Sequence, residues 1–188
     1  MEYIPVGQNN NMNFIDTSVQ KYFSLARTAG LTEYMYIISN IFDVSFYSFI
    51  VFICITALVY LFRGVRYAIL FFLTIVSTGV LVYLFKIFFN IARPTDGVFV
   101  AFGQSFPSYH ATMATVFFVI LMYIFDNYFS SFLRVIFNII CLTLVFTVSF
   151  SRIYLGVHWL SDVLFGMILG VFIVYFSVWV FRKSTASL

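Results

Sequence analysis

Long apolar runs alternate with short polar connections over most of the chain. Five such runs occupy residues 44–62, 67–85, 111–125, 132–150 and 159–181, and they contain almost no charged residue. An apolar helix of about 20 residues is long enough to cross the hydrocarbon core of a bilayer. The pattern therefore predicts an all-α fold, a polytopic transmembrane helical bundle with five spans.

The segment before the first run has a different pattern. Apolar residues recur at roughly helical spacing through residues 13–43 and are interrupted by Asp16, Lys21 and Arg27. This pattern predicts an amphipathic helix lying on the membrane surface, and we expect Gly30 to break it. Partial insertion of the same segment would raise the number of spans to six.

The composition excludes a soluble domain. Of 188 residues, 63% are hydrophobic and 9% are charged, and there are 27 Phe and 13 Tyr. The length leaves room for one folded domain. We divide the chain into a disordered N-terminus (1–12), an amphipathic interfacial segment (13–43), a transmembrane domain (44–183) and a cytoplasmic tail (184–188).

The cations outside the interfacial segment are distributed unevenly over the connections. If the spans alternate in direction, one side of the membrane receives Arg63, Arg66, Arg134, Arg182 and Lys183. By the positive-inside rule this side is cytoplasmic. The opposite side receives the interfacial segment, the long connection after the second run and the start of the last run.

Three polar clusters fall on that opposite side. In the first, Lys86 and Arg93 are seven residues apart and Pro94 follows. On a continuing helix both cations would share a face, about 10 Å apart along the axis, and could hold one anion between them. The alternative is two cations whose side chains reach the membrane interface.

The second cluster, at residues 105–110, opens the third run and contains Ser108, Tyr109 and His110. A helix that begins at Ser108 has free backbone N–H groups and a dipole that favours an anion. His110 could then give a proton to a leaving oxygen. The alternative is an N-cap serine beside a polar interfacial histidine.

The third cluster opens the last run and contains Arg152, His158 and Asp162. On a helix, His158 and Asp162 are four residues apart and share a face, so the carboxylate can orient the imidazole. Arg152 brings a permanently charged fork suited to phosphate. The alternative is a histidine at a helix start beside an interfacial arginine. Both histidines of the chain lie in these clusters, which favours a shared site.

The three clusters resemble the signature motifs of the type 2 phosphatidic acid phosphatase superfamily, whose members share their pocket with the vanadium-dependent haloperoxidases. The resemblance covers about residues 60–175. The chain departs from the family pattern in two of the motifs. Tyr109 replaces the usual glycine of the second motif, and Thr95-Asp96 stands where many members have a second Arg-Pro.

The resemblance implies a role for each matching residue. His158 would attack phosphorus and form a phosphohistidine, with Asp162 orienting it, and His110 would protonate the leaving group and then activate water. The phosphoryl oxygens would be held by Lys86, Arg93, Ser108, Arg152 and the backbone N–H of Tyr109. Neither a metal nor another cofactor is expected, because these cations supply the electrostatic stabilisation.

We therefore expect an integral membrane enzyme that hydrolyses a lipid phosphate or diphosphate at the outer face of a bacterial cytoplasmic membrane. Candidate substrates are undecaprenyl diphosphate, phosphatidylglycerophosphate, phosphatidic acid and a lipid A type phosphate. The expected partners are membrane lipids and no nucleic acid, and the sequence indicates no oligomeric state. Two alternatives are a non-catalytic phosphatase-like lipid-binding protein and a transporter of anionic lipids, although a transporter should carry charges near mid-membrane.

Overall fold

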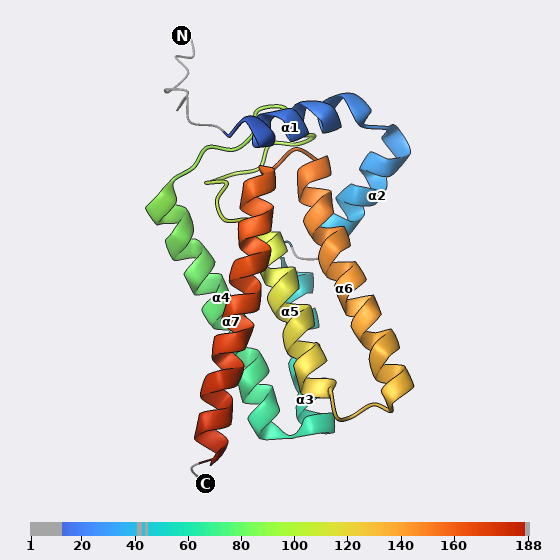
Figure 1. Cartoon of the computed structure of the whole chain (residues 1–188), viewed down its shortest axis with the longest axis vertical. Helices are drawn as coiled ribbons and strands as arrows, with labels where there is room; N and C mark the ends of the chain where they lie inside the picture. Colours follow the sequence, from blue (N-terminus) through green and yellow to red (C-terminus); the bar gives the residue numbers. More distant parts are fainter. Residues whose placement is uncertain (1–12, 41–42, 44, 187–188) are drawn as a thin grey trace.

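The computed structural model is all-helical and describes residues 13–40, 43 and 45–186 (Figure 1). Within these residues the helices are α1 (Phe14–Ala26), α2 (Ala29–Asn40), α3 (Phe46–Arg63), α4 (Val65–Phe89), α5 (Tyr109–Phe125), α6 (Ser131–Tyr154) and α7 (Leu160–Ala186). The predicted disorder of residues 1–12 lies outside the described residues. Part of the predicted tail is helical, because α7 continues to Ala186.

Five apolar helices correspond to the five predicted spans. Helices α3, α4, α6 and α7 have at least 18 residues each and are apolar enough to cross a membrane. Helix α5 has 17 residues, or about 25 Å, against a hydrocarbon core of about 30 Å. Helices α1 and α2 have 13 and 12 residues and are too short to add a sixth span. The chain is thus an integral membrane protein with several candidate spans.

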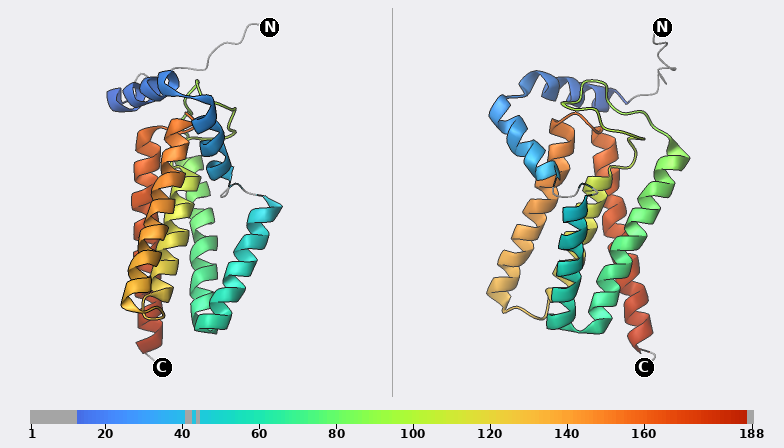
Figure 2. Two further views of the ribbon diagram at one scale, coloured as in Figure 1. Left: turned by 90° about the vertical axis from the view of Figure 1, so that its right-hand side faces the viewer. Right: turned by 180° about the vertical axis from the view of Figure 1, so that it is seen from behind.

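Helix α5 occupies the centre of the bundle, and the other long helices surround it (Figures 1 and 2). Its residues Val116, Ile120 and Ile124 are fully buried and belong to one apolar core with Phe71 of α4 and Val174 of α7. The outward faces of α3, α4 and α6 carry large exposed apolar side chains instead of polar ones. This arrangement suits a bundle whose outer surface contacts lipid.

Two glycines allow α7 to approach α5 closely. A Cβ atom at Gly166 would lie 2.8 Å from Thr112 Oγ1, and one at Gly170 would lie 2.8 Å from Thr115 Cβ. Any side chain at either position would therefore push the two helices apart. The close approach fixes the start of α5 against the start of α7, and both of these starts carry motif residues.

Helix α1 lies across one end of the bundle, and α2 descends from it beside α6 (Figure 2). The chain turns at Arg27, whose backbone is extended, while Gly30 lies inside α2, so the prediction that Gly30 ends the helix is wrong. Tertiary contacts fix the turn instead. Arg27 Nε donates to the Tyr154 carbonyl at 3.0 Å, and the Thr28 N–H donates to the Tyr154 hydroxyl at 3.0 Å.

Helix α1 directs a polar residue toward the protein and an apolar edge away from it. The buried Asp16 accepts hydrogen bonds from the backbone N–H and the hydroxyl of Ser161, at 2.8 and 2.7 Å. Asp16 thereby satisfies a free N–H in the first turn of α7. Phe14 and Leu25 are 81% and 80% exposed, so α1 presents an apolar edge on its outer side.

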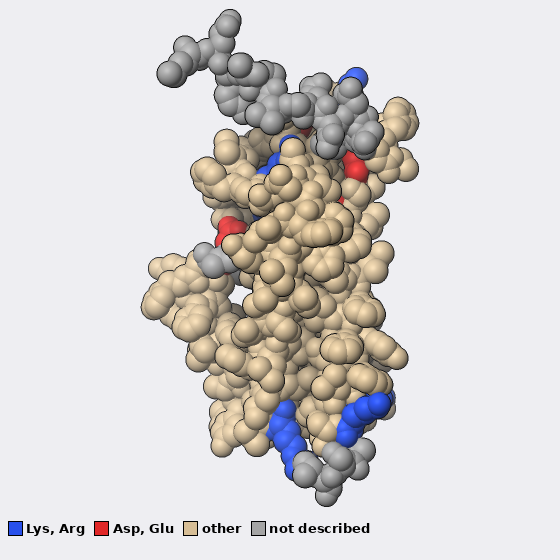
Figure 3. Space-filling view, turned by 90° about the vertical axis from the view of Figure 1, so that its left-hand side faces the viewer, with Lys and Arg blue, Asp and Glu red and all other residues tan. Residues whose placement is uncertain are grey.

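The two ends of the bundle differ in charge. Arg182 and Lys183 lie near the end of α7, and the α3–α4 and α5–α6 turns lie at the same end of the bundle (Figure 1). Lys and Arg side chains gather at this end in Figure 3. The opposite end carries α1, α2, the long 90–108 connection and the α6–α7 turn. On the face drawn in Figure 3, the surface between the two ends is almost free of Lys, Arg, Asp and Glu. All three motifs lie at the end that carries α1.

Candidate active site

His158 and Asp162 meet at the junction of α6 and α7. His158 precedes the first residue of α7. The expectation that His158 and Asp162 lie on one continuous helix is therefore wrong. Their side chains still meet, with 3.4 Å between His158 Nδ1 and Asp162 Oδ2. The same oxygen accepts the backbone N–H of Trp159 at 3.0 Å, as the side chain at the third helical position of a capping box does. The Ser105 hydroxyl also donates to it, so the carboxylate is fixed from several sides.

The other ring nitrogen of His158 faces Arg93. His158 Nε2 lies 3.0 Å from Arg93 Nη1, and a guanidinium can only donate. Nε2 must therefore accept through its lone pair, which leaves the ring proton on Nδ1, toward Asp162. Burial holds the pKa of His158 well below its ordinary value, and the positive charges of Arg93, Arg152 and Lys86 lower that pKa further. The imidazole is neutral, with its lone pair directed at the cations.

Lys86 and Arg93 belong to different elements, and only Arg93 contacts His158 directly. Helix α4 ends at Phe89, because Asn90 adopts a left-handed backbone conformation with φ 44°. Lys86 thus lies in the last turn of α4 and Arg93 in the connection that follows. The prediction that both cations share one face of a continuing helix is wrong, although the structure brings both to the same region.

Backbone carbonyls hold these two cations in place. Lys86 Nζ donates to the carbonyl of Gln104 at 2.6 Å. Arg93 donates through Nε to Gly103 at 2.9 Å and through Nη1 to Val157 at 2.8 Å. Among the described residues, neither cation forms a salt bridge with a carboxylate. Their positive charge is therefore not neutralised by a direct ion pair.

Arg152, in the last turn of α6, is the third cation of the site and is buried. Its Nη1 donates to the hydroxyl of Ser39 in α2, and its guanidinium lies 5.9 Å from the ring centroid of Phe99. Its Nε is buried without a hydrogen-bond partner among the described residues. A buried donor without a partner costs about 1–3 kcal/mol, and an oxyanion bound beside it would satisfy it.

Ser108 is the N-cap of α5 and connects the second motif to the third. Its Oγ accepts from the N–H of Ala111 at 3.5 Å, and its own N–H donates to the carbonyl of Asp162 at 3.1 Å. Tyr109 occupies the first helical position, where a backbone N–H has no acceptor within the helix. The Tyr109 ring is partly buried and packs edge-on against His110, with 5.8 Å between centroids.

His110 pairs with an acid that the sequence analysis did not select. His110 Nε2 lies 2.7 Å from Asp43 Oδ1, while His110 Nδ1 is buried without a partner among the described residues. The hydrogen bond from His110, together with the charges of His110 and Arg152, holds the pKa of Asp43 below its usual range. Asp43 is therefore ionised at neutral pH.

Ser39 and Asp43 are the contributions that sequence reasoning missed. Ser39 lies in a stretch with no motif, and no sequence signal distinguishes it. Asp43 had a signal, because it is an isolated carboxylate just before the first span on the motif side of the membrane. All eight predicted site residues lie at the α1 end of the bundle, on the 86–110 and 152–162 stretches that the contacts above join.

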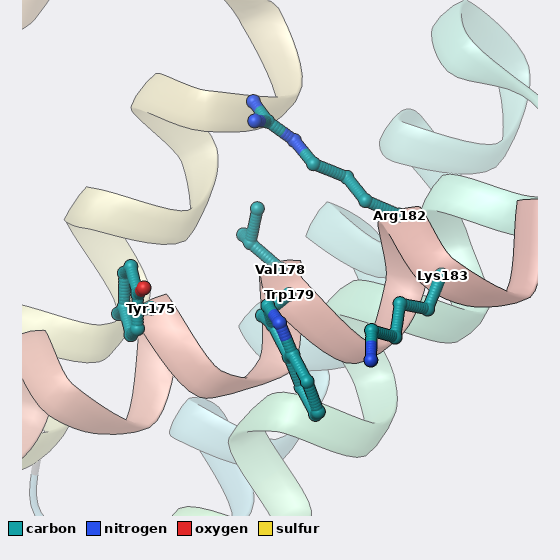
Figure 4. A pocket seen from close by; sticks show the side chains of 5 residues that line it. All are labelled: Tyr175, Val178, Trp179, Arg182 and Lys183. Carbon is teal, nitrogen blue, oxygen red and sulfur yellow. The ribbon is translucent and has the colours of Figure 1, made fainter. Parts of the chain in front are cut away.

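No group of three or more His, Cys, Asp and Glu side chains in the described part of the chain is placed to hold a metal ion. A cavity of about 450 Å³ is lined by Tyr175, Val178, Trp179, Arg182 and Lys183 (Figure 4). It lies near the C-terminal end of α7, at the opposite end of the bundle from the three motifs.

Solved structures share this fold. A transmembrane PAP2 type phosphatidylglycerolphosphate phosphatase from Bacillus subtilis has a TM-score of 0.81 and 26% identity, over 89% of this chain and 85% of that chain. LpxE from Aquifex aeolicus has a TM-score of 0.72 over 90% of this chain and 98% of that chain. Its identity is 23%, so this likeness concerns the fold alone. No curated protein matches the chain in sequence.

The family match covers the part of the chain that carries the motifs. Residues 67–186 match the model of the PAP2 superfamily. This range is more than half of the chain and includes nearly all of α4, all of α5 to α7 and all three clusters. The resemblance inferred from the motifs is thereby confirmed, and the chain is a member of the PAP2 superfamily.

Proposed function

We propose that the chain is a lipid phosphatase that transfers a phosphoryl group from a lipid phosphomonoester or diphosphate to Nε2 of His158. The observation that carries this proposal is the orientation of His158, with Nδ1 toward Asp162 and the Nε2 lone pair beside Arg93. A neutral imidazole with its lone pair at a cluster of cations is a nucleophile directed at the place where an anion binds.

The reaction has two steps. In the first, an Nε2–P bond forms and the P–O bond to the leaving group breaks, while protonated His110 gives its proton to the leaving oxygen. The imidazole of His158 becomes positively charged, and Asp162 stabilises it. In the second, water attacks phosphorus and gives a proton to His110. The P–N bond then breaks, which releases inorganic phosphate and restores His158.

The remaining motif residues stabilise the phosphoryl group. Lys86, Arg93 and Arg152 bind its oxygens and offset the charge that develops in the transition state. The backbone N–H of Tyr109 donates at the positive end of the α5 dipole. The Ser108 hydroxyl, which accepts the Ala111 N–H as a cap, still has its own proton to donate.

The position of the site selects lipid substrates. The motifs lie at the end of the bundle opposite Arg182 and Lys183, so the positive-inside rule places them at the outer face. A phosphate headgroup can enter there while its hydrocarbon tail remains in the bilayer. We assign the chain to a bacterial cytoplasmic membrane. Phosphatidylglycerophosphate is the first substrate to test, because the 26% identical Bacillus subtilis relative is named for this lipid.

The test is phosphate release by the purified chain in detergent, in excess EDTA. The panel contains phosphatidylglycerophosphate, phosphatidic acid, undecaprenyl diphosphate and a lipid A type phosphate. We expect release from at least one of these, trapping of an acid-labile phosphoenzyme, and loss of both in His158→Ala. No release from any lipid by folded protein would refute the proposed function. Activity that EDTA abolishes and Mg²⁺ restores would refute the metal-free mechanism.

A further inference from the structure

Each of the two histidines in the site has its own carboxylate. His158 is paired with Asp162 through Nδ1, with 3.4 Å between the nitrogen and the oxygen. His110 is paired with Asp43 through Nε2, at 2.7 Å. Asp43 lies in the connection between α2 and α3, outside residues 67–186 that match the family model. A comparison of motifs therefore cannot select it.

The start of α3 and the end of α2 hold Asp43 in place. The carbonyl of Asp43 accepts from the Ser48 hydroxyl at 2.7 Å, and its N–H donates to the carbonyl of Asn40 at 3.2 Å. Ser48 in turn forms a capping box with Ser45 at the first turn of α3. These contacts use the backbone of Asp43, so the carboxylate is positioned independently of its bond to His110.

The pairing determines which nitrogen of His110 is available. An ionised carboxylate can only accept hydrogen bonds, so Nε2 of His110 carries the ring proton and donates a hydrogen bond to Asp43. Nδ1 of the neutral ring then carries the lone pair, and it is buried without a partner among the described residues. The two histidines are thus used in opposite senses, since His158 keeps its lone pair on Nε2 and His110 keeps its lone pair on Nδ1.

We propose that Asp43 is the positioning residue of the acid–base histidine: it fixes His110 with Nδ1 toward the reacting group and stabilises the protonated ring. The inference rests on the proposed function, in which His110 alternates between acid and base. Arg152 and Arg93 also act on this imidazole, and both repel a positive charge on it. The negative charge of the Asp43 carboxylate offsets this repulsion and stabilises the protonated form of His110.

The leaving group distinguishes this role from a structural one. An alkoxide leaves slowly unless it is protonated, whereas 4-nitrophenolate leaves without a proton. Loss of Asp43 should therefore slow the first step for an alkyl phosphate and leave it nearly intact for 4-nitrophenyl phosphate. The second step needs His110 as base for either substrate, so the phosphoenzyme should accumulate from the aryl substrate.

The experiment compares Asp43→Asn and Asp43→Ala with the wild-type chain in detergent. Asp126→Asn is the matched control, since it removes a carboxylate at the other end of the bundle, where Asp126 pairs with Arg134 at 3.7 Å. On the best lipid monoester we expect kcat to fall about 100-fold with KM nearly unchanged. With 4-nitrophenyl phosphate we expect a burst of about one nitrophenolate per chain, followed by slow turnover.

Three outcomes would overturn the inference. The first is wild-type kcat in both Asp43 variants, and the second is an equal fall on both substrates without a burst. Because the side chain of Asp43 is 50% exposed, both variants should fold, and thermal unfolding in detergent checks this. The third is absence of phosphate release by the wild-type chain, which would overturn the proposed function together with this inference. The first two outcomes leave the proposed function intact.

Discussion

The close contact between α5 and α7 predicts that adding one methyl group will destabilise the bundle and disturb the site. A Cβ at Gly166 would lie 2.8 Å from Thr112 Oγ1 and 3.1 Å from the Ser108 carbonyl oxygen. A Cβ at Gly170 would lie 2.8 Å from Thr115 Cβ. Favourable carbon–carbon contacts are about 3.5–4.0 Å, so the helices must move apart by several tenths of an ångström.

The magnitude follows from two opposing effects. Alanine is favoured over glycine inside a helix by about 1 kcal/mol, whereas overpacking of a well-packed interior costs about 1–3 kcal/mol. Gly79 in α4 is the matched control, because a Cβ there meets nothing within 4 Å and the substitution keeps only the gain. The helix-propensity gain cancels between sites, so Gly166→Ala and Gly170→Ala should each be about 1–3 kcal/mol less stable than Gly79→Ala.

Stability is measured by SDS-induced or thermal unfolding in detergent, and activity on the best lipid phosphate. A methyl group at Gly166 would press on the Ser108 carbonyl, so Gly166→Ala should also lower kcat. Gly170→Ala, one turn further from the site, should lower it less. If Gly166→Ala proves as stable as Gly79→Ala, the packing argument is wrong. If Gly170→Ala loses more activity than Gly166→Ala at equal stability, the proposed route from the glycine to Ser108 is wrong.

Three further predictions concern the site and its orientation. Tyr109→Gly should retain catalysis, with a fall of at most about tenfold on the best lipid and a changed ranking of lipids, whereas His158→Ala should lose several orders of magnitude. If folded Tyr109→Gly lost as much activity as His158→Ala, the tyrosine would be implicated in the chemistry. Because the pKa of His158 is lowered on folding, the unfolded chain takes up a proton below about pH 6.5 that the folded chain does not. The melting temperature should therefore decrease as the pH is lowered below that value, and it should decrease less steeply in His158→Gln. Equal slopes in the two proteins would contradict the conclusion that His158 is neutral when folded. Cysteines at Gly97 and Ser131, in a chain whose two native cysteines are replaced, should react with an impermeant thiol reagent from opposite sides of the membrane, and labelling from one side would refute the topology.

The periodic and motif signals of the sequence were sufficient for the transmembrane helices. The predicted run 44–62 corresponds to Phe46–Arg63 of α3, and the predicted run 132–150 lies within α6. These agreements are expected, because hydropathy over a window of about 20 residues depends little on tertiary structure. The pairing of His158 with Asp162 was also predicted, although the acid reaches the histidine from a helix cap.

Contacts between distant segments could not be predicted in this way. Asp43 pairs with His110 across 67 residues of sequence, and Ser39 reaches Arg152 across 113 residues. Neither contact has a periodic signal. The prediction that Arg93 lies on a continuing helix failed for a local reason. Asn90 adopts a left-handed conformation and ends α4 before Pro94 is reached. The predicted end of α1 at Gly30 was wrong because contacts with Tyr154 fix the turn at Arg27 and Thr28.

The carbonyl partners of Lys86 and Arg93 have a consequence for selectivity. Because no carboxylate among the described residues is paired with these cations, an entering phosphate competes only with neutral dipoles. When the phosphate leaves, the same carbonyls can accept hydrogen bonds from the cations again. Uncompensated positive charge attracts a dianion about twice as strongly as a monoanion. Terminal phosphomonoesters approach two negative charges at neutral pH, whereas bulk membrane phospholipids are phosphodiesters with one. If the site binds a lipid phosphomonoester as proposed, we therefore expect it to discriminate this scarce headgroup from the far more abundant phosphodiester lipids by charge.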